Sequence, residues 1–308
     1  MDLGETLSSS WKVFWKYKLL WLFGIVPFLV YLLPIMVSLA FFKPQFLSGS
    51  PNNLITNGFI IFGILYLLLM VIYLFVYVLT DTSIIRGTLL FDQKGEKPTT
   101  RELIKQSLPF YWRVFGLYAI FAGLFIFGMV ALGAFMFLII IASMGMGALC
   151  IFPLYLLIIP VSLLGAAFLE LSRTSIVNEN YGIGECLKRG WALFKAKFWK
   201  IVLMALILNF GLFLINMILA LPLYVLFFIP TFLNLAQNAT TTPEFPVNFF
   251  SSMRWLYLIF IPIYSLLNGI LNTFIREAWA VTYLRLSKLP AAASLSAVPP
   301  LQLNGSEI

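Results

Sequence analysis

Lysine and arginine are distributed very unevenly along this chain. Long apolar runs separate seven polar or terminal segments, and eighteen of the 20 Lys and Arg residues fall in four of them: the N-terminus, about 81–113, about 173–200 and the C-terminus. The three segments in between hold only Lys43 and Arg254. Alternate segments of a membrane protein lie on opposite faces, and Lys and Arg near a span resist translocation. The charge pattern therefore predicts six spans with both termini on the inner face.

The expected fold class is an all-α membrane protein with six transmembrane helices. The chain is 61% hydrophobic and only 10% charged, against about 25% charged residues in a soluble domain. Its apolar runs are long enough for a helix of about 20 residues to cross the bilayer. The first run is too long for a cleaved signal peptide, so we expect a retained span. The predicted spans are 19–42, 54–80, 114–142, 148–172, 199–235 and 255–284.

Reactive groups are scarce. The chain has two cysteines and no histidine, so neither a disulfide framework nor the commonest general base is available. It contains no phosphate-binding loop, no nucleophile elbow and no zinc motif. The net charge is +8, and the basic residues lie beside the spans instead of covering a folded polar surface. This placement argues against a nucleic-acid-binding protein. We therefore expect a protein that is not an enzyme and that carries no cofactor or metal.

A short amphipathic segment recurs before the first, third and fifth spans. Gly4–Leu7, followed by Trp11 and Phe14, matches Gly184–Leu187, followed by Trp191 and Phe194, without a gap at an offset of 180. The middle copy is weaker and aligns at an offset of 97. Its apolar positions have the same spacing, 0, +4 and +7, which is one face of a helix. The capping-box spacing from Thr99 to Glu102 supports a helix start there.

The repeated segment predicts three units, each made of an interfacial helix followed by a helical hairpin. The repeats would cover about 4–93, 101–182 and 184–288, within a membrane domain spanning 1–288. The ends of two even spans also resemble each other, because Leu79–Ile84 matches Leu171–Ile176. Internal symmetry of this kind is common in membrane folds. Residues 289–308 mix Pro, Ala and Ser and predict a disordered cytoplasmic tail.

The interfacial helices are predicted to meet lipid. Three tryptophans are expected to anchor them at head-group depth: Trp11, Trp112 and Trp191. Seven basic residues are expected to contact lipid phosphates, with anionic lipids as partners: Lys12, Lys16, Lys105, Arg113, Lys188, Arg189 and Lys197. Both expectations follow from the depth preference of Trp and from the attraction of basic side chains to anionic head groups.

Polar residues within the spans allow two interpretations. Asn209 and Asn216 lie seven apart in the fifth span, and Asn268 and Asn272 lie four apart in the sixth, so each pair shares a helix face. Interhelical hydrogen bonding is the favoured interpretation, and a polar path between these spans is the alternative.

Acidic residues form a second polar group near the inner ends of the even spans: Asp81, Glu170 and Glu277. Arg173 follows Glu170 by three residues, and Arg276 adjoins Glu277. We expect structural ion pairs there in preference to a proton relay.

The repeated inner helix, with Glu5 before Trp11 and Glu185 before Trp191, resembles a family of bacterial and archaeal integral membrane proteins. This is the membrane domain found ahead of some glycerophosphoryl diester phosphodiesterases, and also found as stand-alone six-span proteins. The resemblance covers roughly residues 1–288 and rests on the pattern. Catalysis in those phosphodiesterases belongs to a separate soluble domain, so the resemblance implies a membrane module without that activity.

The favoured function is a non-catalytic scaffold or accessory subunit of a membrane complex in a prokaryotic plasma membrane, with protein partners and both termini cytoplasmic. The alternative is a transporter or permease-like subunit that moves a small solute or lipid along the asparagine faces. An intramembrane lipid-modifying enzyme is a third hypothesis. It needs convergent acid and base groups, which the sequence barely offers.

Overall fold

The computed structural model describes residues 2–41, 53–143, 148–237 and 247–287. Within those ranges the regular structure is entirely α-helical. The helices are α1 (Leu3–Lys16), α2 (Leu19–Phe41), α3 (Asn53–Lys94), α4 (Thr100–Ala142), α5 (Ala148–Glu179), α6 (Ile183–Ala196), α7 (Phe198–Gln237) and α8 (Val247–Ser287). The predicted tail, 289–308, lies outside the described residues.

The helices are those of a multi-pass membrane protein, as the composition predicts. In the described part of the chain, five stretches are long and apolar enough to cross a bilayer; they belong to α3, α4, α5, α7 and α8. The short helix α1 and the helix α2 meet at an angle of 83° and supply a sixth span if the pair is counted as one. The all-α, multi-span part of the prediction is therefore confirmed.

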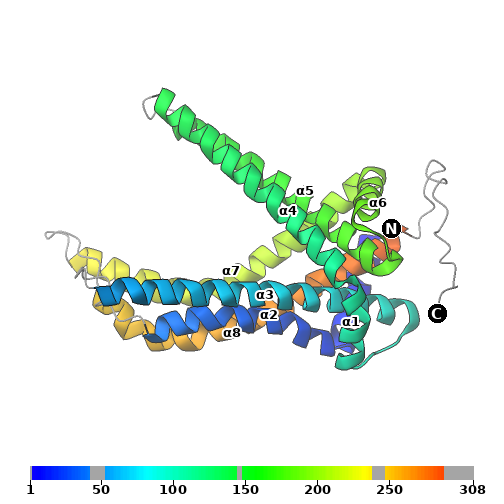
Figure 1. The fold of residues 1–308 in the computed structure, drawn as a ribbon, viewed down its shortest axis with the longest axis horizontal. Helices are drawn as coiled ribbons and strands as arrows, with labels where there is room; N and C mark the ends of the chain where they lie inside the picture. Colours follow the sequence, from blue (N-terminus) through cyan, green and yellow to red (C-terminus); the bar gives the residue numbers. More distant parts are fainter. Residues whose placement is uncertain (1, 42–52, 144–147, 238–246, 288–308) are drawn as a thin grey trace.

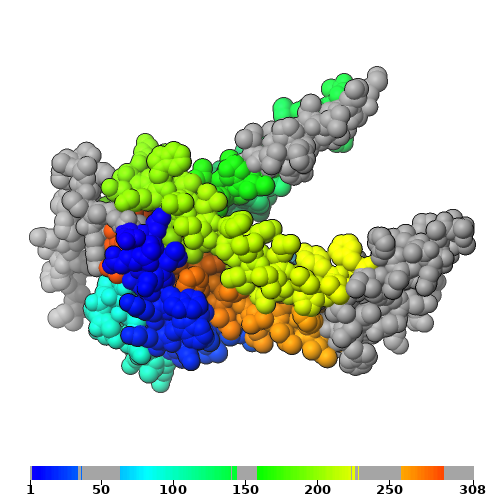
Figure 2. Space-filling model, turned by 180° about the vertical axis from the view of Figure 1, so that it is seen from behind, coloured from blue at the N-terminus to red at the C-terminus, as the bar shows by residue number. Residues whose placement is uncertain are grey.

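The long helices form two diverging groups that share one end. In Figure 1, α2, α3, α7 and α8 run side by side as a rod, whereas α4 and α5 form a hairpin that projects away from it. We call this hairpin the arm. The short helices α1 and α6, the start of α4 and the end of α8 gather where the two groups meet, which we call the base. Figure 2 shows from behind that the arm stands apart from the rod.

The three predicted interfacial segments do not have the same structure. The first and third form separate helices, α1 and α6, which end just before the spans at Tyr17 and Lys197. The middle segment is not separate, because α4 runs without a break from Thr100 to Ala142. Paired lysines flank the first and third breaks, whereas the middle copy has a single basic residue there, Arg113. We attribute the continuous helix α4 to this difference. Two neighbouring lysines favour a helix that ends in water, whereas one arginine allows the helix to continue into the apolar span.

Two even-span helices extend well past their predicted ends. The helix α3 continues to Lys94 and α5 continues to Glu179, so most of the predicted inner loops is helical. The helix α7 also runs through Pro222 and Pro230, although a proline removes a helix hydrogen bond and can bend or end a helix. The extended ends of α3 and α5 bring polar residues of both helices into the base, where the buried core lies.

The closest crossing in the rod joins α2 to α8. A Cβ atom added to Gly24 would lie 1.8 Å from Thr273 Oγ1, and one added to Gly269 would lie 2.8 Å from the Cα atom of Ile25. Only glycine allows the two backbones to approach so closely, as in other membrane helix pairs built on small residues. This crossing fixes α8 beside α2 and sets the position of the residues that follow on α8.

Candidate functional site: a buried charge cluster at the base

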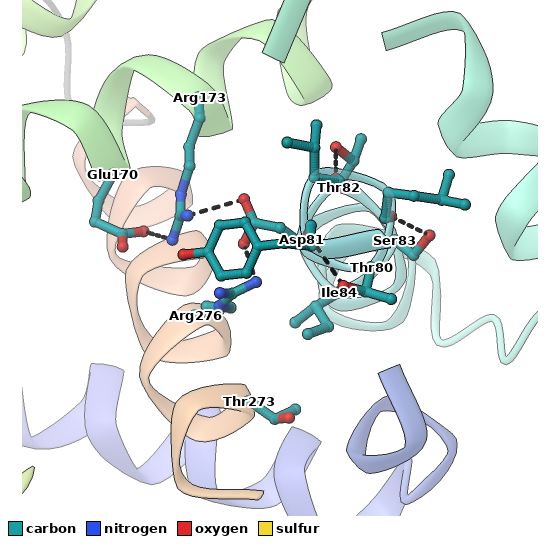
Figure 3. A network of polar contacts seen from close by, with 12 residues as sticks. Thr80, Asp81, Thr82, Ser83, Ile84, Glu170, Arg173, Thr273 and Arg276 are labelled. Atoms are coloured by element: carbon teal, nitrogen blue, oxygen red, sulfur yellow. Dashed lines mark hydrogen bonds and ion pairs between the residues drawn. The ribbon is translucent and has the colours of Figure 1, made fainter. Parts of the chain in front are cut away.

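Three long helices each contribute one charged residue to the centre of the base. Asp81 of α3 receives Arg173 of α5, with 2.8 Å between Arg173 Nη1 and Asp81 Oδ2. Arg276 of α8 approaches the other carboxylate oxygen, with 2.5 Å between Nη1 and Oδ1, although the angles do not make a hydrogen bond. Figure 3 shows the two guanidinium groups converging on Asp81. All three residues are buried, so we call them the charge cluster.

Neighbouring side chains complete the environment of the cluster. Glu170, one turn before Arg173 on α5, forms an ion pair with the second nitrogen of that guanidinium. Tyr118 of α4 donates a hydrogen bond of 2.8 Å to Asp81 Oδ2. The ring of Tyr77 lies 4.7 Å from the Arg276 guanidinium carbon, which is a cation–π distance. The cluster therefore links α3, α4, α5 and α8, and two carboxylates balance two guanidinium groups.

Small hydroxyl residues surround the charged positions of α3 and α5. On α3 these are Thr80, Thr82 and Ser83, and on α5 they are Ser172, Thr174 and Ser175; all are buried. Each hydroxyl donates to a carbonyl of its own helix three or four residues earlier. They need no partner on another helix, and their small size allows α3, α5 and α8 to pack closely.

The two central residues occupy matching positions in segments that resemble each other. When Leu79–Ile84 is aligned with Leu171–Ile176, Asp81 falls on Arg173, and these two residues form the ion pair. Glu170 pairs with Arg173, as their spacing in the sequence predicts. The contacts of Arg173 with Asp81 and Tyr118 are not predicted from the sequence. One feature of the sequence points to the pair of Asp81 and Arg173: two similar segments carry opposite charges at matching positions.

Chemically, the charge cluster is suited to holding helices together. Buried charges are costly to desolvate, and the cost is offset only where the charges pair with good geometry. Here each guanidinium has a carboxylate partner, and with Glu170 included the two acidic and two basic groups balance. The described part of the chain shows no metal-ligand group of three or more His, Cys, Asp or Glu residues. The arrangement fixes the register of four helices.

Glu277 does not form the ion pair with Arg276 that the sequence suggests. Adjacent residues of a helix point about 100° apart, so Arg276 faces Asp81 while Glu277 faces another direction. Glu277 is 0% exposed, and neither of its carboxylate oxygens has a hydrogen-bond partner among the described residues. It is therefore a buried acid that stands outside the balanced cluster.

The predicted lipid-contact residues fall into two groups. Lys12, Lys16, Lys105 and Lys188 are exposed, and Lys197 is half-buried at the junction of α6 and α7. The other two are engaged within the protein. Arg113 donates to the backbone and side-chain oxygens of Asn180, at 3.1 and 2.7 Å, and Arg189 Nε lies 3.4 Å from Glu179 Oε2. Lipid contact by these residues stays a prediction.

The predicted tryptophan anchors all face outward at the base. Trp11, Trp112 and Trp191 are each at least half exposed. The helix α1 buries a neighbouring face, which includes Thr6, Ser10 and Phe14. The predicted apolar face of α1 consists of Leu7, Trp11 and Phe14, and of these only Phe14 is buried. The exposed Trp11 is therefore available to lipid head groups.

The four asparagines of the predicted path bond chiefly within their own helices. Each of the four asparagines donates its amide to a carbonyl of its own helix: Asn209, Asn216, Asn268 and Asn272. One bond joins the two helices, from the Tyr264 hydroxyl to Asn216 Oδ1 at 3.3 Å. A pocket of about 210 Å³ between α1, α7 and α8 is lined by Leu, Ile, Phe and Gly residues. The polar path stays a prediction.

A larger apolar groove runs along the arm, between α4 and α5. Its volume is about 730 Å³, and its lining includes Phe125, Met129 and Val161. Gly128 and Gly165 also line it, and a Cβ added to either glycine would meet no atom within 4 Å. At its end nearest the base the groove reaches Tyr118, which contacts the charge cluster.

Comparison with protein-family models, curated proteins and solved structures gives no match for this chain.

Proposed function

We propose that this chain is a non-catalytic scaffold or accessory subunit of a membrane complex, and that the arm receives a transmembrane helix of a protein partner. In this proposal the protein lies in a prokaryotic plasma membrane with both termini in the cytoplasm. The single observation that carries the proposal is the apolar groove of the arm. The groove lies between α4 and α5, and this hairpin diverges from the other long helices.

A partner helix fits the groove for a physical reason. Apolar faces alone do not drive helix association in lipid, whereas small residues that allow close backbone approach do. The groove combines such residues, Ala122, Gly128, Gly165 and Ala166, with large apolar side chains beside them. The rest of the bundle provides no neighbour for this surface, because the arm diverges from the rod (Figure 1).

The structural role is supported by how the charged residues are used. The buried guanidinium groups of the charge cluster pair with carboxylates inside the protein. Such an arrangement holds the base together and leaves the arm to extend from it. A subunit that positions a partner needs this kind of rigid support, whereas a catalyst needs reactive groups that face a substrate.

We also propose that the chain is built from three repeats. Burial in the short inner segments supports this, since positions related by the offsets of 97 and 180 are buried together. They are Thr6, Leu103 and Cys186; Ser10, Ser107 and Gly190; and Phe14, Tyr111 and Phe194. The basic residues of these segments lie at one end of the molecule, in keeping with a common cytoplasmic face.

The test compares glycines inside and outside the groove. Gly128→Phe and Gly165→Phe would place a large side chain in the groove, at positions where an added Cβ atom meets no atom within 4 Å. Gly123→Phe and Gly133→Phe are matched controls, since these glycines are equally open but do not line the groove. Each tagged variant is purified in a gentle detergent from native membranes, and retained proteins and lipids are identified by mass spectrometry. A photo-cross-linker at Ala166 reports direct contact.

We expect one stoichiometric membrane protein to co-purify with the wild type and both controls, to cross-link at Ala166, and to be lost from both groove variants. Retention of the partner by the groove variants would place its site elsewhere. A groove that cross-links only to lipid, or wild-type protein that transports a solute when reconstituted alone, would reject the proposal.

A transporter is the second candidate, and Glu277 is the observation that favours it. An ionisable residue buried in a membrane span is a common element of proton-coupled transport. Transport of a solute into vesicles by wild-type protein, abolished by Glu277→Gln, would support this candidate over the scaffold.

A further inference from the structure

Glu277 is the most isolated buried acid in the described part of the chain. Its side chain is completely enclosed, and both of its oxygens lack a hydrogen-bond donor among the described residues. Buried polar groups are nearly always hydrogen-bonded, so each exception calls for an explanation. An isolated carboxylate in an apolar interior is far less stable than the neutral acid, and such a group takes up a proton.

The helices packed against α8 offer Glu277 no compensating charge. The helix α2 has no charged residue between Leu19 and Phe41. On α1, Glu5, Lys12 and Lys16 are exposed, and on α7 Lys200 is exposed.

The remaining charges that face α8 have other contacts. On α3, Asp81 belongs to the charge cluster, the Arg86 guanidinium lies over the Phe110 ring, and Asp92 pairs with Arg285 of α8. On α5, Arg173 pairs with Glu170 and Asp81, and Glu179 contacts Arg189 and Tyr283.

Charge balance strengthens this argument. The charge cluster and Glu170 contain two acidic and two basic groups, so their sum is zero. An ionised Glu277 would add an uncompensated negative charge next to Arg276 in the sequence. A protonated Glu277 adds no charge to this balanced group.

We propose that Glu277 is a proton-binding site and that the folded protein holds it as the neutral acid. Release of the proton to water leaves a carboxylate on the same helix turn as Arg276. Because this carboxylate faces away from Arg276, it has no hydrogen-bond partner among the described residues, and its burial beside α8's neighbours becomes unfavourable. Protonation of Glu277 therefore controls how firmly α8 is joined to α3 and α5. The inference does not depend on the partner helix proposed for the arm.

Infrared spectroscopy of the full-length protein in lipid nanodiscs tests the proposal directly. A protonated carboxylic acid has a C=O stretching band that a carboxylate lacks. We expect the wild type at neutral pH to show such a band, with the intensity of one acid per chain. The band should be missing from Glu277→Gln, which has nearly the same shape and no charge. Glu96→Gln, at an exposed carboxylate, is the control that keeps the band.

A pH series supplies the second measurement. As the pH rises, the wild type should lose its C=O band and its thermal stability together, because the carboxylate is then uncompensated. Glu277→Gln should remain stable over the same range. If this variant does not fold, the wild-type band alone decides, and its absence at neutral pH overturns the proposal. A stability that depends on sodium in place of pH would identify a cation site and would also overturn it.

Discussion

The base and the arm differ in which side chains they bury and which they expose. At the base, charged and hydroxyl side chains are buried, and Ile84, beside the charge cluster, is completely enclosed. Along the arm the side chains are apolar and face outward, and Phe127 is 72% exposed. The difference shows that large apolar side chains dominate the exposed surface of the arm, whereas the interior of the base combines an apolar core with buried polar side chains.

This reversal has a physical origin. In a bilayer an exposed phenylalanine costs nothing, because lipid tails are as apolar as the protein interior. Helices are therefore joined by close packing of small residues and by polar contacts. The base has both, through the charge cluster and the crossing at Gly24 and Gly269. In the described part of the chain, the polar contacts of the arm with α3 lie near the base, at Tyr118 and Arg173, and the outer part of the arm diverges from the rod.

The comparison predicts that the largest effect comes from removing the shared carboxylate of the base. Asp81→Asn leaves Arg173 paired with Glu170 and removes the carboxylate that Arg276 contacts. Removing one member of a buried ion pair typically costs about 3–5 kcal/mol, because the remaining charge is uncompensated. Thermal unfolding in detergent should show this loss.

The exposed pair between Lys94 and Glu96 provides the control for Asp81→Asn. Its atoms are 4.0 Å apart and its side chains are more than half exposed. Glu96→Gln should change the free energy of unfolding by less than about 0.5 kcal/mol. Adding Arg173→Gln to Asp81→Asn should recover part of the loss, since one positive charge is removed as well. Equal stability of Asp81→Asn and wild type would mean that the charge cluster does not hold the base.

Glycine substitutions should have a smaller effect, with a clear difference between the rod and the arm. Gly24→Ala places a methyl group against Thr273 and the backbone of α8. Overpacking of this kind costs about 1–3 kcal/mol. Gly123→Ala in the arm meets no atom within 4 Å and should cause no loss, because alanine favours a helix over glycine. Similar losses in both variants would contradict the view that close packing is confined to the base and rod.

The helical content and the presence of several apolar membrane-length helices follow from the sequence, because both depend on local composition. The continuous α4 does not, since the break before a span depends on a few residues, and the middle copy lacks the lysine pair of the other two. The ends of α3 and α5 were also placed too early. Their hydroxyl residues resemble a loop in composition, but they bond to their own helices and are buried at the base.

The charge cluster could be predicted only in part. Glu170 and Arg173 lie one turn apart, so helix geometry alone brings them together. Arg276 and Glu277 are neighbours in sequence but diverge around the helix, and that pairing was wrong. The contacts of Asp81 join residues on separate helices, and they depend on how α3, α5 and α8 cross. Such crossings are fixed by close contacts like that of Gly24, which sequence periodicity does not reveal.

The smallest expected effect concerns α6, at the outer edge of the base, and tests whether this helix stays packed against its neighbours. Cys186 of α6 is buried there, and burial raises the pKa of its thiol to about 11. In a Cys150→Ser background the thiol should react with maleimide about 100-fold more slowly than an exposed thiol at neutral pH, since the thiolate reacts. The rate should rise with pH toward the pKa. Lys188→Cys, combined with Cys186→Ser in the same background, provides the exposed reference on α6.

Glu185→Ala then loosens α6 without touching the thiol. The Glu185 carboxylate accepts a hydrogen bond of 3.2 Å from the Gly182 N–H at the start of the helix. Loss of such a cap costs about 1 kcal/mol or less and should speed modification of Cys186 by about fivefold or less. A larger acceleration would mean that α6 opens independently of the base. An unchanged rate would mean that contacts with α5 hold the helix without its cap. The size of the change thus measures how far the tight packing of the base extends toward the surface.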